Sequence, residues 1–333
     1  MAIRISAIRT SLPLVAALLA SPVLAWEPTK AVEMILPSGS GSGTDQMARL
    51  MSSIAAKNEL SVKPYVVIPK GGAGGAEGFI DLKMSPKNPH KILVSASHMY
   101  MLPLTANVPF KWDEMTPVAN IVMDEFVLWV NADSPYKTAS DFVAAAKANP
   151  GKIRIGGAGS KREDNLVVAA MENAANVKFN YIPYKGGGEV ATQLVGKHIE
   201  ASVNNPVEAV SQWRAGQLRP LCVFDDEPMV QTKKVTETES WSSIPTCKSA
   251  GIDVTYLMLR SIHMPSGVTP EQIAYYANQM EKIVATPEWK DFSERNAFKS
   301  KFLTGDALQK FLEADAKKHH EQLDKAGFLA KAR

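Results

Sequence analysis

The sequence predicts an α/β protein with two domains, mostly parallel sheets, and a hinge that leaves a cleft between the domains. Three observations predict this fold. Short apolar runs alternate with segments of helical period, this series occurs twice without repeating its sequence, and a late apolar run is placed to return the chain to the first domain. Strands and helices that alternate in this way form right-handed βαβ units.

The first series opens the first domain. A buried strand at residues 31–36 is broken by serines and glycines before a helix at 45–56. A second strand follows at 62–68, and a third lies at 92–95.

The second series begins with the apolar strand 126–131, which we expect to be the first crossover between the domains. The elements expected after it are a helix at 140–148 with Thr138 as its cap, a strand at 152–156, a helix at 165–175, and strands at 179–183 and 199–203. The strand 256–264 then returns the chain, and the helices expected to complete the first domain are 270–286, 287–295 and 306–326. We therefore expect domain 1 to comprise 26–130 plus 253–333, and domain 2 to comprise 131–252.

Residues 1–25 are predicted to be a secretory signal peptide. Arg4 and Arg9 precede the apolar run 12–24, and Ala25 ends it before Trp26. We therefore expect a periplasmic protein that is cut after Ala25.

Charge argues against two classes of partner. The formal charge of +3 falls to about +1 once the two signal-peptide arginines are removed. Such a balance predicts binding neither to nucleic acid nor to a membrane surface.

Four glycine- or serine-rich loops, 38–43, 71–75, 156–160 and 185–188, each follow a predicted strand and precede a predicted helix. In an open parallel sheet such loops gather at the carboxyl ends of the strands, where ligands bind. Their backbone N–H groups and helix N-termini attract anions without a cationic side chain. One such loop alone is explained by strand termination, but four together favour an anion-binding cleft.

Motifs of other chemistries are missing from the sequence. The run Gly39-x-Gly41-x-x-Thr44 lacks the third glycine of a dinucleotide fingerprint, and no phosphate-binding P-loop motif occurs. The histidines do not have metal-ligand spacing, and His319-His320 fit a solvated helix face. No Gly-x-Ser-x-Gly elbow occurs. We therefore expect no cofactor, no metal and no catalytic residue.

Three charged residues near the loops have two interpretations each. Asp45 starts the first helix, where N-terminal capping is a better explanation than catalysis. Arg162 and Lys185 lie beside binding loops, where they either pair with a carboxylate or remain surface charges.

The chain has two cysteines, Cys222 and Cys247. In an oxidising compartment these two residues can form one disulfide, which we expect here. The alternative is a pair of buried free thiols.

An ordered set of motifs covers nearly all of residues 26–333. The motifs are Lys30-Ala-Val32, Gly41-Ser-Gly-Thr-Asp45 with Ala48-Arg49, Lys70 to Gly75, Pro183-Tyr-Lys-Gly186, Leu194 to Glu200, Val203-Asn204-Asn205, Ala215 to Leu221 and Pro245 to Gly251. In this order they resemble the periplasmic solute-binding proteins of tripartite tricarboxylate transporters, the TctC/Bug group.

The resemblance implies a type II periplasmic-binding-protein fold that closes like a jaw on a ligand carboxylate. It implies that backbone amides of the first loop and of the Gly159-Ser160 loop hold this carboxylate. Three departures affect the pocket: Ser38 replaces an aromatic residue, Asn204 replaces an aspartate, and the segment 159–166 has extra residues and no histidine. The resemblance therefore does not indicate which of the family's ligands this chain binds.

The loops and the resemblance together give the candidate ligand-binding residues. They are Ser38, Gly39, Ser40, Gly41, Ser42, Gly43, Thr44, Asp45, Ser97, His98, Gly157, Gly159, Ser160, Arg162, Asn165, Tyr184, Lys185, Gly186, Asn204 and Asn205.

The expected function is capture of a small organic carboxylate, such as a dicarboxylate, a tricarboxylate or an aromatic acid, with no chemistry performed on it. The resemblance implies delivery to the large and small integral-membrane subunits of a transporter, and a monomer is expected. One alternative is a carboxylate-binding protein that feeds a membrane sensor, which only the partner's identity would distinguish. The other is a periplasmic enzyme, for which paired titratable groups should converge on the cleft.

Overall fold

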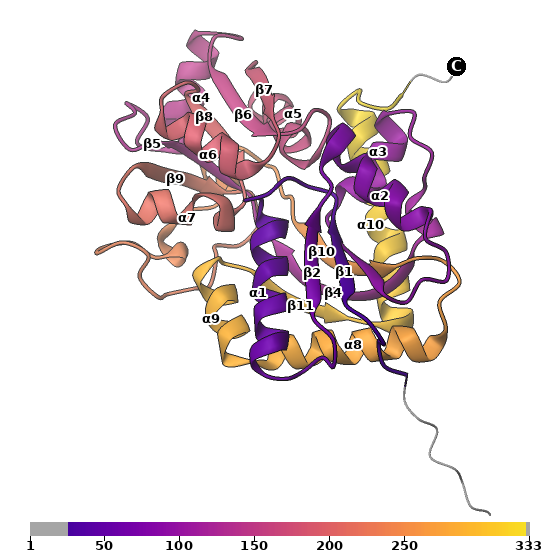
Figure 1. Cartoon of the computed structure of the whole chain (residues 1–333). Coiled ribbons are helices and arrows are strands. Elements are labelled where there is room, and N and C mark those ends of the chain that lie inside the picture. The colour runs from indigo at the N-terminus through magenta and orange to yellow at the C-terminus, as the bar shows by residue number, and fades with distance from the viewer. Residues whose placement is uncertain (1–25, 331–333) are drawn as a thin grey trace, which may run out of the picture.

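The computed structural model describes residues 26–330, so the predicted signal peptide lies outside the described residues. The chain forms two lobes, each built on one β-sheet with helices packed against it (Figure 1). The N-terminal strands and the C-terminal helices share one lobe, and the middle of the chain forms the other (Figure 1). The two-domain α/β fold predicted from the sequence is confirmed.

Domain 1 is built from two separate parts of the chain. The first part contains β1 (Val32–Leu36), α1 (Gly43–Lys57), β2 (Tyr65–Pro69), η1 (Gly72–Gly75), α2 (Ala76–Lys83), β3 (Lys91–Ser95), α3 (His98–Thr105), η2 (Trp112–Glu114) and β4 (Thr116–Asp124). The second part contains β10 (Met258–Met264), α8 (Pro270–Ala285), α9 (Pro287–Arg295), β11 (Lys299–Leu303) and α10 (Gly305–Lys325).

Domain 2 is formed by the chain between these parts. Its elements are β5 (Val127–Asn131), α4 (Ala139–Ala148), β6 (Arg154–Ala158), α5 (Glu163–Ala175), β7 (Asn180–Tyr184), α6 (Gly187–Val195), β8 (Ala201–Asn204), α7 (Pro206–Arg214), β9 (Leu218–Val223), η3 (Trp241–Ser243) and η4 (Cys247–Ala250). Helix α4 begins as the sequence predicts, because Thr138 and Asp141 form a capping box.

Both sheets are mixed, which differs from the expected mostly parallel pairing. The strand orders are β11-β4-β10-β3-β1-β2 and β7-β6-β8-β5-β9. Strand β10 pairs antiparallel with β3 and β4, and β5 pairs antiparallel with β8 and β9. These two strands enter a domain from the other domain, so they run away from the interdomain face while their neighbours run toward it. The reversal of β5 and β10 therefore follows from the two chain crossings, whereas β11, which pairs antiparallel with β4, reverses within domain 1.

Strand β5 lies inside the sheet of domain 2, between β8 and β9. The sequence assigned this strand to the end of domain 1, with the boundary at residue 130. Leu128 and Val130 pack into the apolar core of domain 2, as do Val254 and Tyr256 of the returning segment. The structure therefore places residues 126–130 and 253–256 with domain 2, because their apolar side chains are buried there.

Helix α10 connects the domains a third time, which the sequence did not indicate. Leu308 and Leu312 near its start pack in domain 1. Leu323 near its end packs against the core of domain 2, and Phe328 follows it there. The C-terminal helix therefore contacts both domains, in addition to the two crossing strands.

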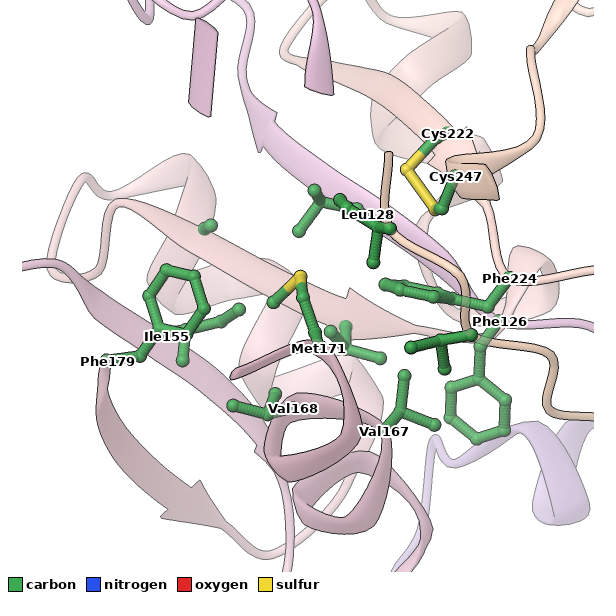
Figure 2. Packing of buried hydrophobic residues seen from close by; sticks show 14 of the residues in the cluster. Phe126, Leu128, Ile155, Val167, Val168, Met171, Phe179, Cys222, Phe224 and Cys247 are labelled. Carbon is green, nitrogen blue, oxygen red and sulfur yellow. A yellow bond between two sulfur atoms is a disulfide. The ribbon is translucent and has the colours of Figure 1, made fainter. Parts of the chain in front are cut away.

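An apolar cluster between the sheet and α5 forms much of the core of domain 2. Figure 2 shows Val167, Val168 and Met171 of α5 facing Leu128 and Ile155 of the sheet. All five side chains are almost fully buried. Burial of a side chain of this size contributes about 1.5–3 kcal/mol to folding, so this face fixes α5 and the loop that precedes it.

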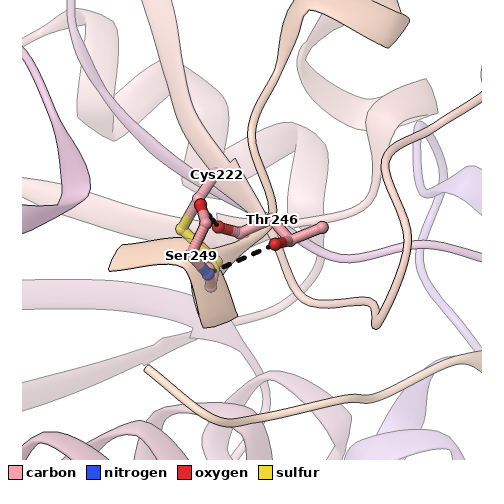
Figure 3. Close-up of a disulfide and its surroundings, with 4 residues drawn as sticks. Cys222, Thr246 and Ser249 are labelled. Carbon is pink, nitrogen blue, oxygen red and sulfur yellow. Dashed lines mark hydrogen bonds between the residues drawn. A yellow bond between two sulfur atoms is a disulfide. The ribbon is translucent and has the colours of Figure 1, made fainter. Parts of the chain in front are cut away.

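A disulfide joins Cys222 and Cys247, the pairing predicted from the sequence (Figure 3). Cys222 lies in β9, and Cys247 is the first residue of η4. Thr246 caps this short helix by accepting the Ser249 N–H at 3.3 Å. The bond closes a loop with a sequence separation of 25 residues, and a loop of that size stabilises by about 3 kcal/mol on the entropic model.

One lysine connects both chain crossings at the hinge. Glu125 follows β4 and Asp225 follows β9, and Lys299 of β11 forms ion pairs with both carboxylates. Glu125 is completely buried, and its carboxylate oxygens lack hydrogen-bond partners. Burial, with Asp225 nearby, raises the pKa of Glu125 to about 8. The hinge therefore contains an acid that resists ionisation.

Glu125→Gln should stabilise the folded protein more at pH 8 than at pH 5. The pKa of Glu125 is about 8 in the folded state, against 4.5 for an unperturbed glutamate. The folded chain thus retains a proton that the unfolded chain has released, so this group lowers the free energy of unfolding as pH rises between these values. We expect a gain of about 2 kcal/mol at pH 8 and little at pH 5, measured by urea unfolding.

Glu227→Gln provides the matched control, since Glu227 is an exposed acid near the same hinge. An equal gain in both variants, or no gain at pH 8 for Glu125→Gln, would contradict this view of the hinge.

Candidate functional site

Glycine-rich loops of the two domains meet at the interdomain face. In each sheet these loops follow strands that end at the edge facing the other domain. A Cβ built at Gly188 would lie 3.0 Å from the Gly41 carbonyl oxygen, and one at Gly186 would lie 3.8 Å from Cβ of Ser42. The first loop and the 185–188 loop are therefore in contact, and they precede α1 and α6 respectively. Side chains at these glycines would keep the two backbones apart.

The first loop is fixed by hydrogen bonds at the start of α1. Ser42 is the N-cap and accepts the Asp45 N–H at 3.3 Å. The hydroxyl of Ser38 lies 3.0 Å from that of Ser42. Asp45 accepts the Gly41 N–H at 2.9 Å and pairs with Arg49 at 3.0 Å. Asp45 thus has the helix-terminal role preferred from the sequence.

The predicted loop 156–160 is fixed in a similar way at the start of α5. Gly159 has φ +74°, a conformation that favours glycine. Its carbonyl oxygen accepts the Tyr181 hydroxyl at 2.7 Å. Asp164 accepts the Ala158 N–H at 2.7 Å, and burial raises the pKa of Asp164 well above its usual value.

Asn165 and Ser160 of the same region have different surroundings. The side-chain oxygen of Asn165 accepts the Lys161 N–H at 2.9 Å, which closes the loop. Ser160 is exposed. Helix α5 begins at Glu163, two residues before the expected start at Asn165.

His98 of α3 and Glu163 of α5 join the two domains through a buried contact. The His98 backbone N–H donates to Glu163 Oε1 at 2.6 Å, and Nδ1 lies 3.2 Å from the same oxygen. Nε2 lies 3.1 Å from the Pro37 carbonyl oxygen, so both ring nitrogens face acceptors. Burial alone would raise the pKa of Glu163, but Arg162 and His98 hold it below its usual range. The Glu163 carboxylate is therefore ionised here.

A buried arginine lies beneath the first loop. Arg260 of β10 is 2 % exposed. Its Nε and Nη2 donate to Asp124 at the end of β4, at 3.0 and 2.5 Å. Nη1 donates to the Thr44 hydroxyl at 2.6 Å, and Nη2 lies 3.3 Å from the Asn205 side-chain oxygen. One guanidinium therefore connects α1 and β4 of domain 1 to the start of α7 in domain 2.

Some of the remaining predicted residues form hydrogen bonds with backbone groups, and others lie on the surface. Ser97 is fully buried and accepts the Leu259 N–H at 3.3 Å, and the Asn204 amide donates to the Gly187 carbonyl at 2.9 Å. Residues at or beside the loop contacts are Gly39, Gly157 and Tyr184. Ser40 and Lys185 are exposed.

Five charged residues of this face were not predicted from the sequence: Asp124, Glu163, Asp164, Glu208 and Arg260. Two signals were available. Arg260 interrupts the apolar run of the return strand, and Asp124 ends another apolar strand. A charge placed inside an apolar strand requires a buried counter-charge. No such signal distinguishes Glu208 from an ordinary helix-surface acid.

Asp124→Asn should strongly destabilise the protein, because it leaves the Arg260 guanidinium buried without a counter-charge. Removal of one partner of a buried ion pair costs about 3–5 kcal/mol. Replacement of both charges, by Asp124→Leu with Arg260→Met, should recover at least half of that loss. Urea unfolding of the three proteins tests this, and a double variant as unstable as Asp124→Asn alone would contradict it.

Comparisons with known proteins identify the family and the fold. The family model described as tripartite tricarboxylate transporter family receptor matches residues 47–328. A curated relative from Cupriavidus necator, called UPF0065 protein in gbd 5'region, is 27% identical over 92% of this chain and 90% of its own length. Within residues 26–330, no helix combines the length and apolar character needed to cross a membrane.

Two solved structures share the fold. The periplasmic binding protein BugD is 20% identical, with a TM-score of 0.81 over 91% of this chain and 99% of BugD. R. palustris Rpa4515, solved with adipate, is 18% identical, with a TM-score of 0.82 over 90% of this chain and 98% of that one. The family match spans most of the chain, and the fold agrees with it. The chain therefore belongs to the receptor family of the tripartite tricarboxylate transporters.

Proposed function

We propose that this chain is an exported binding protein that captures a small organic carboxylate and delivers it to a tripartite tricarboxylate-type membrane transporter. The predicted signal peptide, the family and the solved structure of an adipate-bound neighbour support this proposal. The partners would be the large and small integral-membrane subunits, and the chain would act in the periplasm as a monomer.

The observation that carries the proposal is the contact between the glycine-rich loops that precede α1 and α6. Helix N-termini present backbone N–H groups and a positive partial charge, which suit a carboxylate. The buried Arg260 adds positive charge directly behind the first loop, since a Cβ at Gly43 would lie 2.8 Å from Nη2. The hydroxyls of Ser38, Ser42 and Thr44 supply further polar groups in this region.

Several titratable groups of this face have structural partners. Asp45 pairs with Arg49, and Glu163 contacts His98 and Arg162. An acid that is held by an ion pair is a poor general acid or base, because its proton affinity is fixed by that partner. These pairs favour a binding protein over an enzyme that acts on the carboxylate.

The mature protein should bind one organic acid per chain and release it unchanged. A thermal-shift screen against mono-, di- and tricarboxylates identifies the acid, since a ligand at 100 times its Kd stabilises by about 2.7 kcal/mol. Calorimetry then gives the stoichiometry, and chromatography after long incubation tests for product. No response to any acid, or the appearance of product, would contradict the proposal.

Backbone amides, not lysine or arginine side chains, should dominate the affinity. Gly188→Ala suits this test because its Cβ would press on the Gly41 carbonyl, 3.0 Å away, and alanine favours the helix. Gly43→Val is less suitable, because its Cβ would meet Val207 and Arg260 at 2.7 and 2.8 Å and disturb the buried network as well. We expect Gly188→Ala to weaken binding about tenfold, which is about 1.4 kcal/mol.

Lys185→Ala and Arg162→Ala provide the comparison. If the ligand were salt-bridged, either change would remove most of the affinity and binding would weaken steeply with salt. Calorimetry at low and high salt separates the two mechanisms, and a severe loss in a cation variant with none in Gly188→Ala would exclude the backbone cradle.

A further inference from the structure

Glu208 of domain 2 reaches across the interdomain face to the start of α1. Its Oε1 accepts the Gly43 N–H at 3.0 Å. Its other oxygen packs on Gly187, where a Cβ would lie only 1.8 Å from Oε2. The carboxylate therefore lies between the first residues of α1 and α6, with glycine on both sides.

Backbone and helix ends hold this carboxylate, not a side-chain cation. Among residues 26–330, no lysine, arginine or histidine forms an ion pair with Glu208 within 4.0 Å. Burial raises the pKa of Glu208, whereas Arg260 and the Gly43 N–H act in the opposite direction. Glu208 thus has the environment that the first loop would offer to the carboxylate of a ligand: a backbone N–H, a helix N-terminus and a guanidinium behind it.

We propose that Glu208 occupies the position of the ligand carboxylate and must leave it when the ligand binds. The inference rests on the proposed function, because it assumes that the first loop receives the ligand. One N–H group cannot satisfy two carboxylates, and two anions at one helix N-terminus repel each other. Glu208 therefore competes with the ligand. When no ligand is bound, Glu208 holds the two domains together.

The first arm of the test uses the protein without ligand. Hydrogen exchange of residues 41–45 should be slower in the wild type than in Glu208→Ala, because the Gly43 N–H loses its acceptor. Glu208→Gln should fall between them, since its side-chain oxygen still accepts but carries no charge. Equal exchange in all three proteins would overturn the inference.

Glu172→Ala is the matched control. Glu172 also accepts a backbone N–H, that of Phe179 at 2.7 Å, but it lies in α5 and its contact stays within domain 2. Removal of its charge should leave exchange at 41–45 unchanged. A change as large as that of Glu208→Ala would show that charge alone, and not the contact, controls this loop, which also overturns the inference.

The second arm measures binding of adipate, malate and citrate by calorimetry. Glu208→Ala should bind the preferred acid about tenfold more tightly than the wild type, which is about 1.4 kcal/mol, while Glu172→Ala should match the wild type. Tighter binding supports displacement. Weaker binding by Glu208→Ala would overturn it, and would show instead that the contact between Glu208 and Gly43 supports the ligand-bound form.

The two proposals fail in different ways. If neither the wild type nor Glu208→Ala binds any carboxylate, the proposed function fails together with the ligand part of this inference, and the exchange arm still decides whether Glu208 holds Gly43. If the wild type binds an acid and Glu208→Ala binds it no more tightly, the transport proposal stands and displacement is wrong.

Discussion

The backbone N–H groups of the loops need acceptors once the two domains meet, and this requirement shapes the interdomain face. A buried amide without an acceptor costs more than one hydrogen bond returns, so these donors are satisfied by the chain itself. Asp45 accepts from Gly41, Glu208 from Gly43, and Asp164 from Ala158. A face expected to hold an anionic ligand therefore already contains several carboxylates of the protein.

The positive charge of Arg260 offsets the repulsion among the acidic side chains of the interdomain face. Its guanidinium pairs with Asp124, and its field also reaches Glu208. Because Arg260 belongs to the strand that returns from domain 2, it contacts both domains at the point where the chain crosses. Electrostatics and hinge geometry are thus linked through one side chain, and a ligand that replaces an internal carboxylate would leave the overall charge of the closed face unchanged.

The sequence predicted local structure well and long-range contacts poorly. Periodicity, proline and capping residues placed α9 at 287–295 and the start of α4 after Thr138, because these signals lie within a few neighbouring residues. The reversed direction of β5 and the path of α10 across both domains were not predicted, since they depend on how the whole chain returns. The glycine-rich loops were identified from composition alone.

Site chemistry was predicted in part. Asp45 has the expected role at a helix N-terminus, and the first glycine-rich loop contacts the 185–188 loop. The sequence did not predict the hydrogen-bond partners of His98, Asn205 and Ser97. Each of these contacts joins segments more than sixty positions apart in the sequence. Sequence pattern shows which side chains are available, whereas only the fold decides which donors and acceptors meet.

A crystal structure of the mature protein with its tightest organic acid decides whether Glu208 and the ligand use the same position. We expect a carboxylate of the acid to accept the Gly43 N–H and Glu208 to have turned away from it. An acid bound elsewhere, for example in the groove between α5 and α10, or bound at the loops with the Glu208–Gly43 contact intact, would contradict it.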